Sequence, residues 1–255
     1  MKQPPFTITN RIIDQISEIS SLTGRITERN MLNKSPELRR INRIKTIQGS
    51  LAIEQNTLSV EQVTAIINGK HVLAPPEDIK EVQNAYEIYE HLDILDPCSA
   101  DDLLKAHSVM LGDLSDEAGN YRSRPVGVVD SKTGEIIHFG TLPQYVPELM
   151  DKLLSWLAET DVHPLIKASV FHYEFELIHP FIDGNGRMGR LWHTLILSKW
   201  NPLFAWLPVE SMISRNQQDY YSVINYCNNA CESTRFIEFM LDIIISALNE
   251  AIETL

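Results

Sequence analysis

Twelve residues in the second half of the chain, HPFIDGNGRMGR at 179–190, combine several groups that can do chemistry. His179 can act as a general base, because an imidazole takes up a proton readily at neutral pH. Asp183 supplies a carboxylate, which suits a hard cation such as Mg²⁺. Arg187 and Arg190 lie on one face of the first turn of a predicted helix, where their charge opposes the helix dipole. A bound polyanion would reverse that penalty, so the segment predicts a phosphate site.

Three small residues, Gly184, Asn185 and Gly186, come immediately before the predicted helix. Backbone N–H groups of such a turn, together with those of the first helical turn, form a nest for anions. Several phosphates in a row fit best, because one carboxylate could not occupy both arginine forks and the nest. A zinc hydrolase site is the alternative for His179 and Asp183, but no further ligands at zinc spacing support it. The loop therefore predicts a nucleotide-phosphate site with a base beside it.

The elements that position this loop are predicted to be helices, which makes the fold class mainly α. Segments 164–178 and 187–200 flank the loop as two helices. The segment 40–55 has apolar residues at steps of three and four, which predicts one helix face formed by Ile41, Ile44, Ile47 and Leu51. Caps at Ser59 and Ser99 predict the starts of two further helices. The last helices are expected at about 214–229 and 234–253.

One segment, residues 126–139, has the pattern of a β-hairpin, with two β-branched runs around a Lys-Thr-Gly turn. Its open edge could accept a peptide as a third strand.

Two consecutive prolines, Pro75 and Pro76, suggest that the chain is divided at this point. We expect an N-terminal helical segment at 1–76 and the main domain at 77–255.

Charge and composition limit the partners. The net charge of −12 argues against general affinity for nucleic acid. Residues 1–50 contain nine Lys or Arg against four Asp or Glu, and a solvated helix face is the favoured interpretation of this basic segment. The three cysteines fit no metal spacing, which favours a reducing compartment. No signal sequence or membrane span is recognisable, so a soluble, cytoplasmic protein is expected.

The twelve residues resemble the signature of the Fic family, H-x-F-x-[D/E]-G-N-G-R-x-x-R, and match it at every specified position. The resemblance extends to GNYRSRPVGVV, to the hairpin and to the C-terminal helices, so it covers most of residues 85–250. Fic proteins are mostly enzymes that transfer AMP from ATP to a Ser, Thr or Tyr hydroxyl of a target protein and release pyrophosphate. The resemblance implies a Fic-type helical bundle with a small β-hairpin flap, with ATP as co-substrate and Mg²⁺ as cofactor.

The resemblance also implies a role for each matching residue. His179 is the base for the target hydroxyl, and Asp183 holds Mg²⁺ against the α- and β-phosphates. Gly186 favours AMP transfer, because relatives with kinase-like chemistry resemble this motif with Lys there. The residues implied in ATP binding are Gly184, Asn185, Gly186, Arg187 and Arg190 for the phosphates, and Tyr220, Tyr221 and Asn228 for adenosine. The flap residues implied in target binding are Ile136, Ile137 and His138.

A second element, SLAIEQN at 50–56, resembles the family's inhibitory helix, [S/T]-x-x-x-E-[G/N], on a predicted helix of about 40–56. In that pattern the carboxylate of Glu54 pairs with Arg190 and blocks the γ-phosphate pocket, while Ser50 matches the Ser or Thr position. Gln55 departs from the pattern, which has Gly or Asn there. We therefore expect Asn56 to take the left-handed cap and the helix to end one residue later.

Two other functions remain open. The same site could remove AMP from a target, with Glu54 positioning water, as some relatives with an inhibitory glutamate do. Alternatively, the chain could be a nucleotide-sensing interaction module without turnover, although a pure binder has no need of His179. Relatives often assemble, so homo-oligomerisation is also an expectation.

Overall fold

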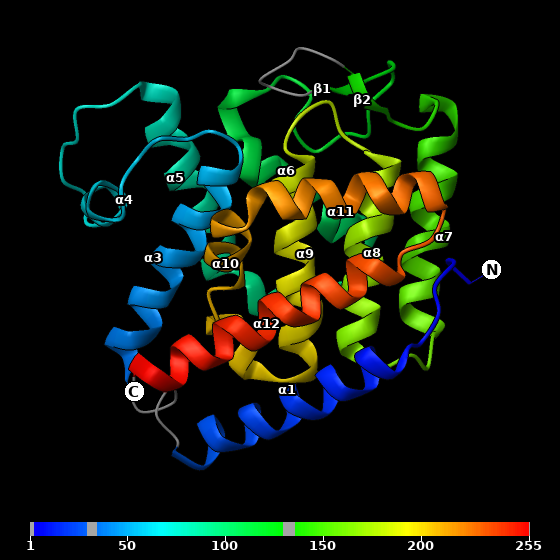
Figure 1. The fold of residues 1–255 in the computed structure, drawn as a ribbon. Helices are drawn as coiled ribbons and strands as arrows, with labels where there is room; N and C mark the ends of the chain where they lie inside the picture. Colours follow the sequence, from blue (N-terminus) through cyan, green and yellow to red (C-terminus); the bar gives the residue numbers. More distant parts are fainter. Residues whose placement is uncertain (1–2, 30–34, 130–135, 255) are drawn as a thin grey trace.

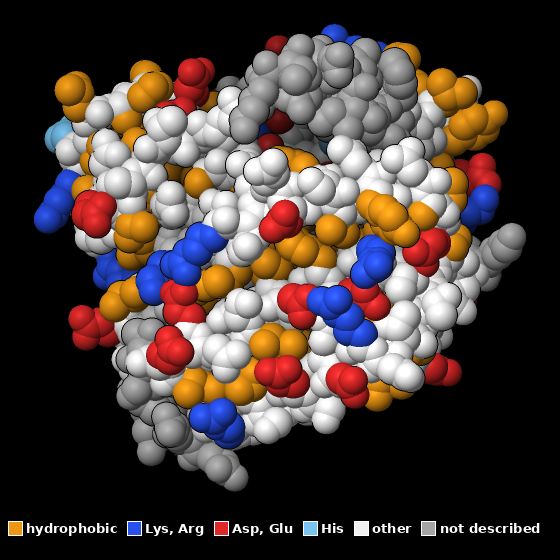
Figure 2. Space-filling view, in the orientation of Figure 1, with side chains coloured by type: hydrophobic (Ala, Val, Ile, Leu, Met, Phe, Trp, Pro, Cys, Tyr) orange, Lys and Arg blue, Asp and Glu red, His pale blue; other side chains and the backbone are white. Residues whose placement is uncertain are grey.

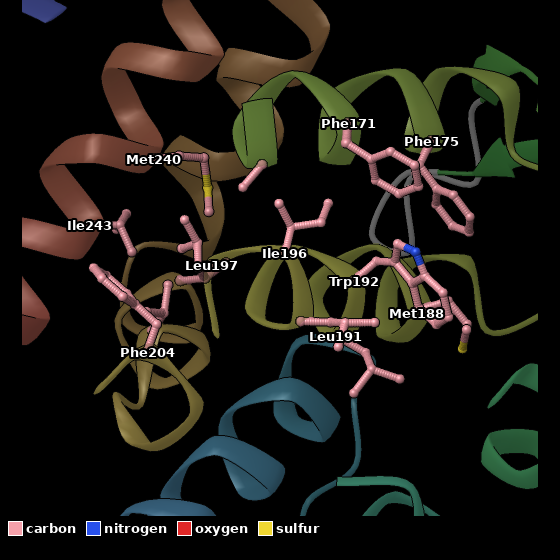
Figure 3. Packing of buried hydrophobic residues seen from close by; sticks show 14 of the residues in the cluster. Phe171, Phe175, Met188, Leu191, Trp192, Ile196, Leu197, Phe204, Met240 and Ile243 are labelled. Atoms are coloured by element: carbon pink, nitrogen blue, oxygen red, sulfur yellow. The ribbon is translucent and has the colours of Figure 1, made fainter. Parts of the chain in front are cut away.

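The computed structural model describes residues 3–29, 35–129 and 136–254. Two helices at its centre, α8 (Pro164–Ile178) and α9 (Asn185–Trp200), pack against each other (Figure 1). Figure 3 shows Phe171 and Phe175 of α8 directed at Trp192 and Met188 of α9. Both helices are buried on nearly all sides, as expected of helices that carry apolar residues around their circumference. The predicted mainly α fold is confirmed.

The two ends of the described chain pack together. Helix α1 (Asn10–Arg29) runs along α12 (Thr234–Thr254), as Figure 1 shows. Sequence analysis did not predict α1, although its spacing carries the information. Its buried residues recur at helical steps: Ile12, Ile19, Leu22 and Ile26. Three further helices of the second half of the chain are α7 (Val146–Glu159), α10 (Val209–Arg215) and α11 (Gln217–Ala230).

Helix α3 (Pro36–Ile53) packs most of its predicted apolar face against the core, since Ile44, Ile47 and Leu51 are buried. The prediction for Ile41 is wrong, since that side chain is 44% exposed. Arg43 is buried instead. Its guanidinium stacks over two aromatic rings, 5.2 Å from the centroid of Tyr89 and 4.7 Å from that of Trp206, which stabilises a cation in the packed interior. The basic residues of this segment therefore do not form one solvated patch.

The predicted helix caps are confirmed. Ser59 forms a capping box with Gln62 at the start of α4 (Val60–Ile67). Ser99 accepts a hydrogen bond from the backbone N–H of Asp102 at the start of α6 (Ala100–Leu111). Between them lies α5 (Pro76–Glu90). The division of the chain at residue 76 stays a prediction, and α1 and α3 both pack on helices of the second part.

Gly49 lets α3 lie close to the backbone of α10. A Cβ at this position would lie 2.7 Å from the backbone nitrogen of Ser211 and 2.8 Å from the carbonyl carbon of Glu210. We expect Gly49→Ala to lower the free energy of unfolding by about 1–3 kcal/mol, because backbone atoms cannot yield as a side chain can. Urea denaturation tests this. Gly24→Ala on α1 is the matched control, since its Cβ meets nothing within 4 Å; equal stability changes in the two variants would contradict the prediction.

The predicted hairpin forms between β1 (Gly127–Val129) and β2 (Ile136–Phe139), which pair antiparallel with Gly127 opposite Phe139. Its predicted Lys-Thr-Gly turn lies outside the described residues. In Figure 1 the hairpin lies near the loop that joins α8 to α9. The two elements meet at Gly140, where a Cβ would lie 3.3 Å from the Cβ of His179.

The surface seen in Figure 2 carries Lys and Arg interspersed with Asp and Glu over α1, α11 and α12. Several of these charges pair across helices, as Arg11 does with Asp242 at 2.6 Å and Arg215 with Glu250 at 2.5 Å. In the described part of the chain, no helix combines the length and apolar character needed to cross a membrane.

Candidate active site

The loop between α8 and α9 reverses the chain at two left-handed residues. His179 caps the end of α8 with φ 52° and ψ 63°, and Gly184 caps the start of α9 with φ 78°. A non-glycine residue in the left-handed region is uncommon and costs about 1 kcal/mol or more. The His179 side chain is 18% exposed. The predicted base is therefore the first residue of the loop, and its left-handed backbone conformation must be stabilised by contacts with the surrounding residues.

Asn185 closes the loop through its side chain. Its Oδ1 accepts a hydrogen bond from the N–H of Phe181 at 2.8 Å, and its Nδ2 donates to the carbonyl oxygen of Phe181 at 2.9 Å. Phe181 itself is buried and stacks on His107 with ring centroids 3.6 Å apart. This closure fixes the loop and leaves the first N–H groups of α9 without helical acceptors.

His107 supports the loop from α6, and sequence analysis did not find it. The N–H of Gly119 donates to its Nδ1 at 2.8 Å, so the ring proton is on Nε2 and is donated to the carbonyl oxygen of Asp183 at 3.0 Å. Burial lowers the pKa of His107 to about 4, so the ring is neutral at pH 7. The hydrogen bond from Gly119 thus fixes the His107 tautomer that can donate to the Asp183 carbonyl oxygen.

Asp183 is suited to hold a divalent cation together with a nucleotide. Its side chain is 63% exposed, with Oδ1 accepting from the N–H of Gly184 at 2.6 Å and Oδ2 lying 3.2 Å from Arg187 Nη2. No cluster of three or more His, Cys, Asp or Glu is present among the described residues. Mg²⁺ usually takes one or two protein carboxylates and completes its shell with water and substrate phosphates. A single exposed carboxylate beside an anion nest fits that cation.

Arg187 is bound by an acid that sequence analysis missed. Its Nη1 donates to Glu81 Oε1 of α5 at 2.8 Å, and the other Glu81 oxygen accepts from Asn56 Nδ2 at 2.9 Å. Glu81 has no motif around it and lies far from Arg187 in the sequence. It links the end of α3 to the start of α9, so both motif arginines have a carboxylate partner within the chain.

Arg190 is buried and makes three hydrogen bonds to the end of α3. Its Nε donates to Ser50 Oγ at 3.2 Å, and its Nη2 donates to the Ser50 carbonyl oxygen at 3.1 Å and to Glu54 Oε1 at 2.7 Å. Burial has the largest single effect and acts to lower the pKa of Arg190, but Glu54, through its charge and its hydrogen bond, acts with Tyr220 and Tyr221 to raise that pKa above its ordinary value. The contact implied by the sequence resemblance is present.

Gly186 gives this carboxylate its space. A Cβ on Gly186 would overlap Glu54 Oε1 and would lie 2.9 Å from Arg190 Nη1. The Glu54 carboxylate therefore lies against the first turn of α9, beside the Arg190 guanidinium. An anionic group already occupies the position that the sequence predicted for phosphate.

The end of α3 differs from the prediction. Gln55, not Asn56, takes the left-handed conformation, with φ 71°. The N–H groups of Gln55 and Asn56 donate to the carbonyl oxygens of Ala52 and Leu51, which completes a Schellman motif. Asn56 follows this cap, and its side chain binds Glu81. The helix ends at Ile53, with Glu54 as its cap.

The adenosine candidates lie on α11 and are placed differently. Tyr220 is buried, and its hydroxyl lies 3.0 Å from His172 Nε2, so it packs behind the site. Tyr221 is 39% exposed. Asn228 Oδ1 accepts a hydrogen bond from the Tyr173 hydroxyl at 3.1 Å. Their contacts with a nucleotide stay predictions, as does target binding by Ile136, Ile137 and His138, whose side chains are outside those described.

Glu176 is a buried acid beside the predicted base. Its Oε2 lies 4.0 Å from His179 Nδ1, and its Oε1 lies 3.8 Å from His172 Nε2. Burial raises the pKa of Glu176 to about 7; Arg190 acts in the opposite direction and Glu54 in the same one. This carboxyl group therefore changes charge near neutral pH.

We expect the stability contribution of Glu176 to fall as pH rises. Its folded pKa of about 7 lies above the ordinary value of 4.5, so the folded state holds its proton longer than the unfolded state. The stability is complete below pH 4.5 and is lost through pH 7, by up to about 3 kcal/mol. Urea denaturation of wild type and Glu176→Gln at pH 5 and about pH 8 measures the difference. If the free energy of unfolding changed equally with pH in the two proteins, Glu176 would not be the source of the pH dependence.

Together, the fold and the loop define a mainly helical protein whose central helix–loop–helix elbow holds the Glu54 carboxylate at Arg190 and lies near a short hairpin. The model of the Fic/DOC family matches residues 97–197. A Fic family protein from Desulfovibrio desulfuricans G20 is 50% identical and superposes with a TM-score of 0.95, over 99% of this chain and 77% of that one. The chain belongs to the Fic/DOC family.

Curated relatives include enzymes. The protein adenylyltransferase fic-1 of Caenorhabditis elegans is 32% identical over 217 residues, which are 79% of this chain and 40% of the relative. The protein adenylyltransferase Fic of Nematostella vectensis is 31% identical over 206 residues, 76% of this chain and 45% of the relative. The chain thus spans less than half the length of these two proteins. A solved structure of Fic-1 from C. elegans, 24% identical, shares the fold with a TM-score of 0.74 over 95% of this chain and 73% of that one.

Proposed function

We propose that the chain is a Mg²⁺-dependent protein adenylyltransferase that moves AMP from ATP to a Ser, Thr or Tyr hydroxyl of a target protein and releases pyrophosphate. One observation carries the proposal. The Glu54 carboxylate occupies an anion position between Arg190 and the first turn of α9, on the same loop as His179. Family membership and the names of the two relatives support AMP transfer as the reaction.

In the proposed reaction, His179 takes the proton of the target hydroxyl as that oxygen attacks the α-phosphorus. The N–H groups at the start of α9 and the Arg187 and Arg190 guanidinium groups hold the phosphates, so that pyrophosphate leaves in line. Asp183 would hold Mg²⁺, which neutralises phosphate charge when bound. We expect Tyr221 and Asn228 to contact adenosine, and the buried Tyr220 to support them.

Glu54 would inhibit this reaction by competing with ATP for Arg190. A carboxylate and a phosphate are alternative ligands of the same guanidinium fork. Relief requires only that the Glu54 side chain leave, because α3 itself is anchored by Gly49 against α10 and by the Ser211 hydroxyl, which donates to the Lys45 carbonyl oxygen at 2.8 Å. We therefore infer that inhibition is relieved by a local change at the end of α3.

Isotope-labelled ATP tests the reaction type. Glu54→Gly is incubated with Mg²⁺ and with ATP labelled on either the α- or the γ-phosphate, and covalent label on the chain or on added protein is measured after denaturation. AMP transfer retains the α label and loses the γ label. Retention of the γ label alone would identify phosphoryl transfer instead and would overturn the proposal.

AMP removal is the second candidate, favoured by the carboxylate of Glu54, which is 34% exposed within the site and could position water. It can be tested on Glu54→Gly protein that has modified itself. Addition of unmodified wild type without ATP should then reduce the AMP adduct measured by mass spectrometry. If the AMP adduct stayed constant in the presence of wild type, AMP removal would be contradicted and AMP transfer would stand.

A further inference from the structure

Arg122 lies in the GNYRSRP segment before β1 and is 2% exposed. Among the described residues, no carboxylate pairs with it, and its side-chain hydrogen bonds go to backbone carbonyl oxygens. Burial lowers its pKa, although an arginine stays charged. Burial of a cation without a counter-ion is costly, so the carbonyl groups that satisfy Arg122 must be held close around it.

Two of these carbonyl groups lie where α8 meets the loop between α8 and α9. Arg122 Nε donates to the His179 carbonyl oxygen at 2.6 Å, and Nη2 lies 3.3 Å from that of Ile178. The backbone N–H of Arg122 also donates to the Pro180 carbonyl oxygen at 3.0 Å. Three consecutive peptide groups are thus bound by one residue. They include the left-handed position of His179, which costs free energy and needs such support.

The other carbonyl groups belong to the root of the hairpin. Arg122 Nη2 also donates to the carbonyl oxygen of Thr141, two residues after β2, and Nη1 donates to that of Arg124 at 3.1 Å. Gly140 permits this packing, since a Cβ there would lie 2.9 Å from Arg122 Nη2 and 3.3 Å from the His179 Cβ. The same guanidinium therefore binds the hairpin and the loop.

We propose that Arg122 is a positioning residue that sets the imidazole of His179 relative to the hairpin, and so relative to the target hydroxyl. The inference rests on the proposed function for its consequence in catalysis, whereas the positioning itself can be measured without turnover. Arg122 touches neither Arg187 nor Arg190, so nucleotide binding is not expected to depend on it. Its effect should fall on the transfer step.

The test uses Arg122→Lys in the Glu54→Gly background. An ammonium group keeps the charge but cannot reach carbonyl groups on both the loop and the hairpin root. We expect kcat for AMP transfer to fall about 10- to 100-fold, while the KM for ATP changes less than about threefold. Arg43→Lys, in the same background, is the matched control because Arg43 is 4% exposed and donates to the Ala205 carbonyl oxygen away from the loop. It should keep kcat within about twofold.

A second measurement is independent of activity. NMR of histidine-labelled protein, with the His179 signal assigned by its loss in His179→Gln, reports the surroundings of the imidazole. Arg122→Lys should shift that signal and Arg43→Lys should not. Arg122→Gln provides a second variant that removes the guanidinium without adding an atom beside His179, in case Arg122→Lys does not fold.

The outcomes separate the two proposals. An unchanged His179 signal and an unchanged kcat in Arg122→Lys overturn the positioning role. Equal losses of kcat and of melting temperature in Arg122→Lys and Arg43→Lys reduce Arg122 to a packing role, which also overturns it. A shifted His179 signal in a protein whose Glu54→Gly variant transfers no AMP supports positioning and contradicts the proposed function alone.

Discussion

Replacing His179 by alanine in the Glu54→Gly background is expected to lower the rate of AMP transfer by about 100- to 10,000-fold. Removal of a general base costs this much because the target hydroxyl then attacks with its proton in place. ATP affinity should change little, since the phosphates are held by the start of α9 and by Arg187 and Arg190. Transfer is measured by intact mass spectrometry, and ATP affinity by calorimetry.

His91→Ala is the matched control for this substitution. His91 is exposed at the end of α5, where its Nδ1 lies 2.8 Å from the Glu87 carbonyl oxygen, and it makes no contact with the loop. Its variant should transfer AMP at the parent rate. If His179→Ala retained more than about a tenth of that rate, another group would be the base, and the role given to His179 would fail.

Replacing Glu54 by glycine is expected to raise AMP transfer by about tenfold to a hundredfold. Hydrogen bonds to charged groups contribute about 1.5–3 kcal/mol. The lower end is expected here because the Glu54 side chain is 34% exposed and partly screened by water. ATP then meets Arg190 without displacing a carboxylate. Initial rates at several ATP concentrations give both the rate and the apparent affinity.

Glu54→Gln distinguishes loss of charge from loss of the side chain. The amide keeps the shape of the carboxyl group but binds a guanidinium more weakly, so this variant should lie between wild type and Glu54→Gly. When His179 is also replaced, all three proteins should show the same low rate of AMP transfer. A Glu54→Gly rate equal to that of wild type would show that the contact with Arg190 does not limit nucleotide binding.

Local spacing was sufficient for a large part of the site. His179, Asp183, the Gly184–Gly186 turn, Arg187 and Arg190 lie within twelve residues, and a helix–loop–helix elbow brings such near neighbours together in any packing. The caps at Ser59 and Ser99 are equally local, because a side chain and an N–H three residues later define them. Helical periodicity likewise predicted most of α3.

Local reasoning failed where packing chose between neighbours. Ile41 is exposed although its spacing fits the apolar face of α3, whereas the cation Arg43 is buried against Tyr89 and Trp206. Gln55 takes the left-handed cap, whereas Asn56 binds Glu81 of another helix through its side chain. In both cases the contacts of the buried or bonded residue are with segments distant in the chain, which local spacing does not encode.

By itself, then, the sequence determined a mainly helical chain and the identity of the groups on the α8–α9 loop, because these depend on contacts between residues close in the chain. Only the tertiary structure decided which distant groups hold that loop. Glu81 on Arg187, His107 on Asp183 and Arg122 on the His179 carbonyl oxygen come from segments 57 to 106 residues away. No short-range spacing encodes these pairs, because they meet only after α5, α6 and the root of the hairpin have packed around α8 and α9.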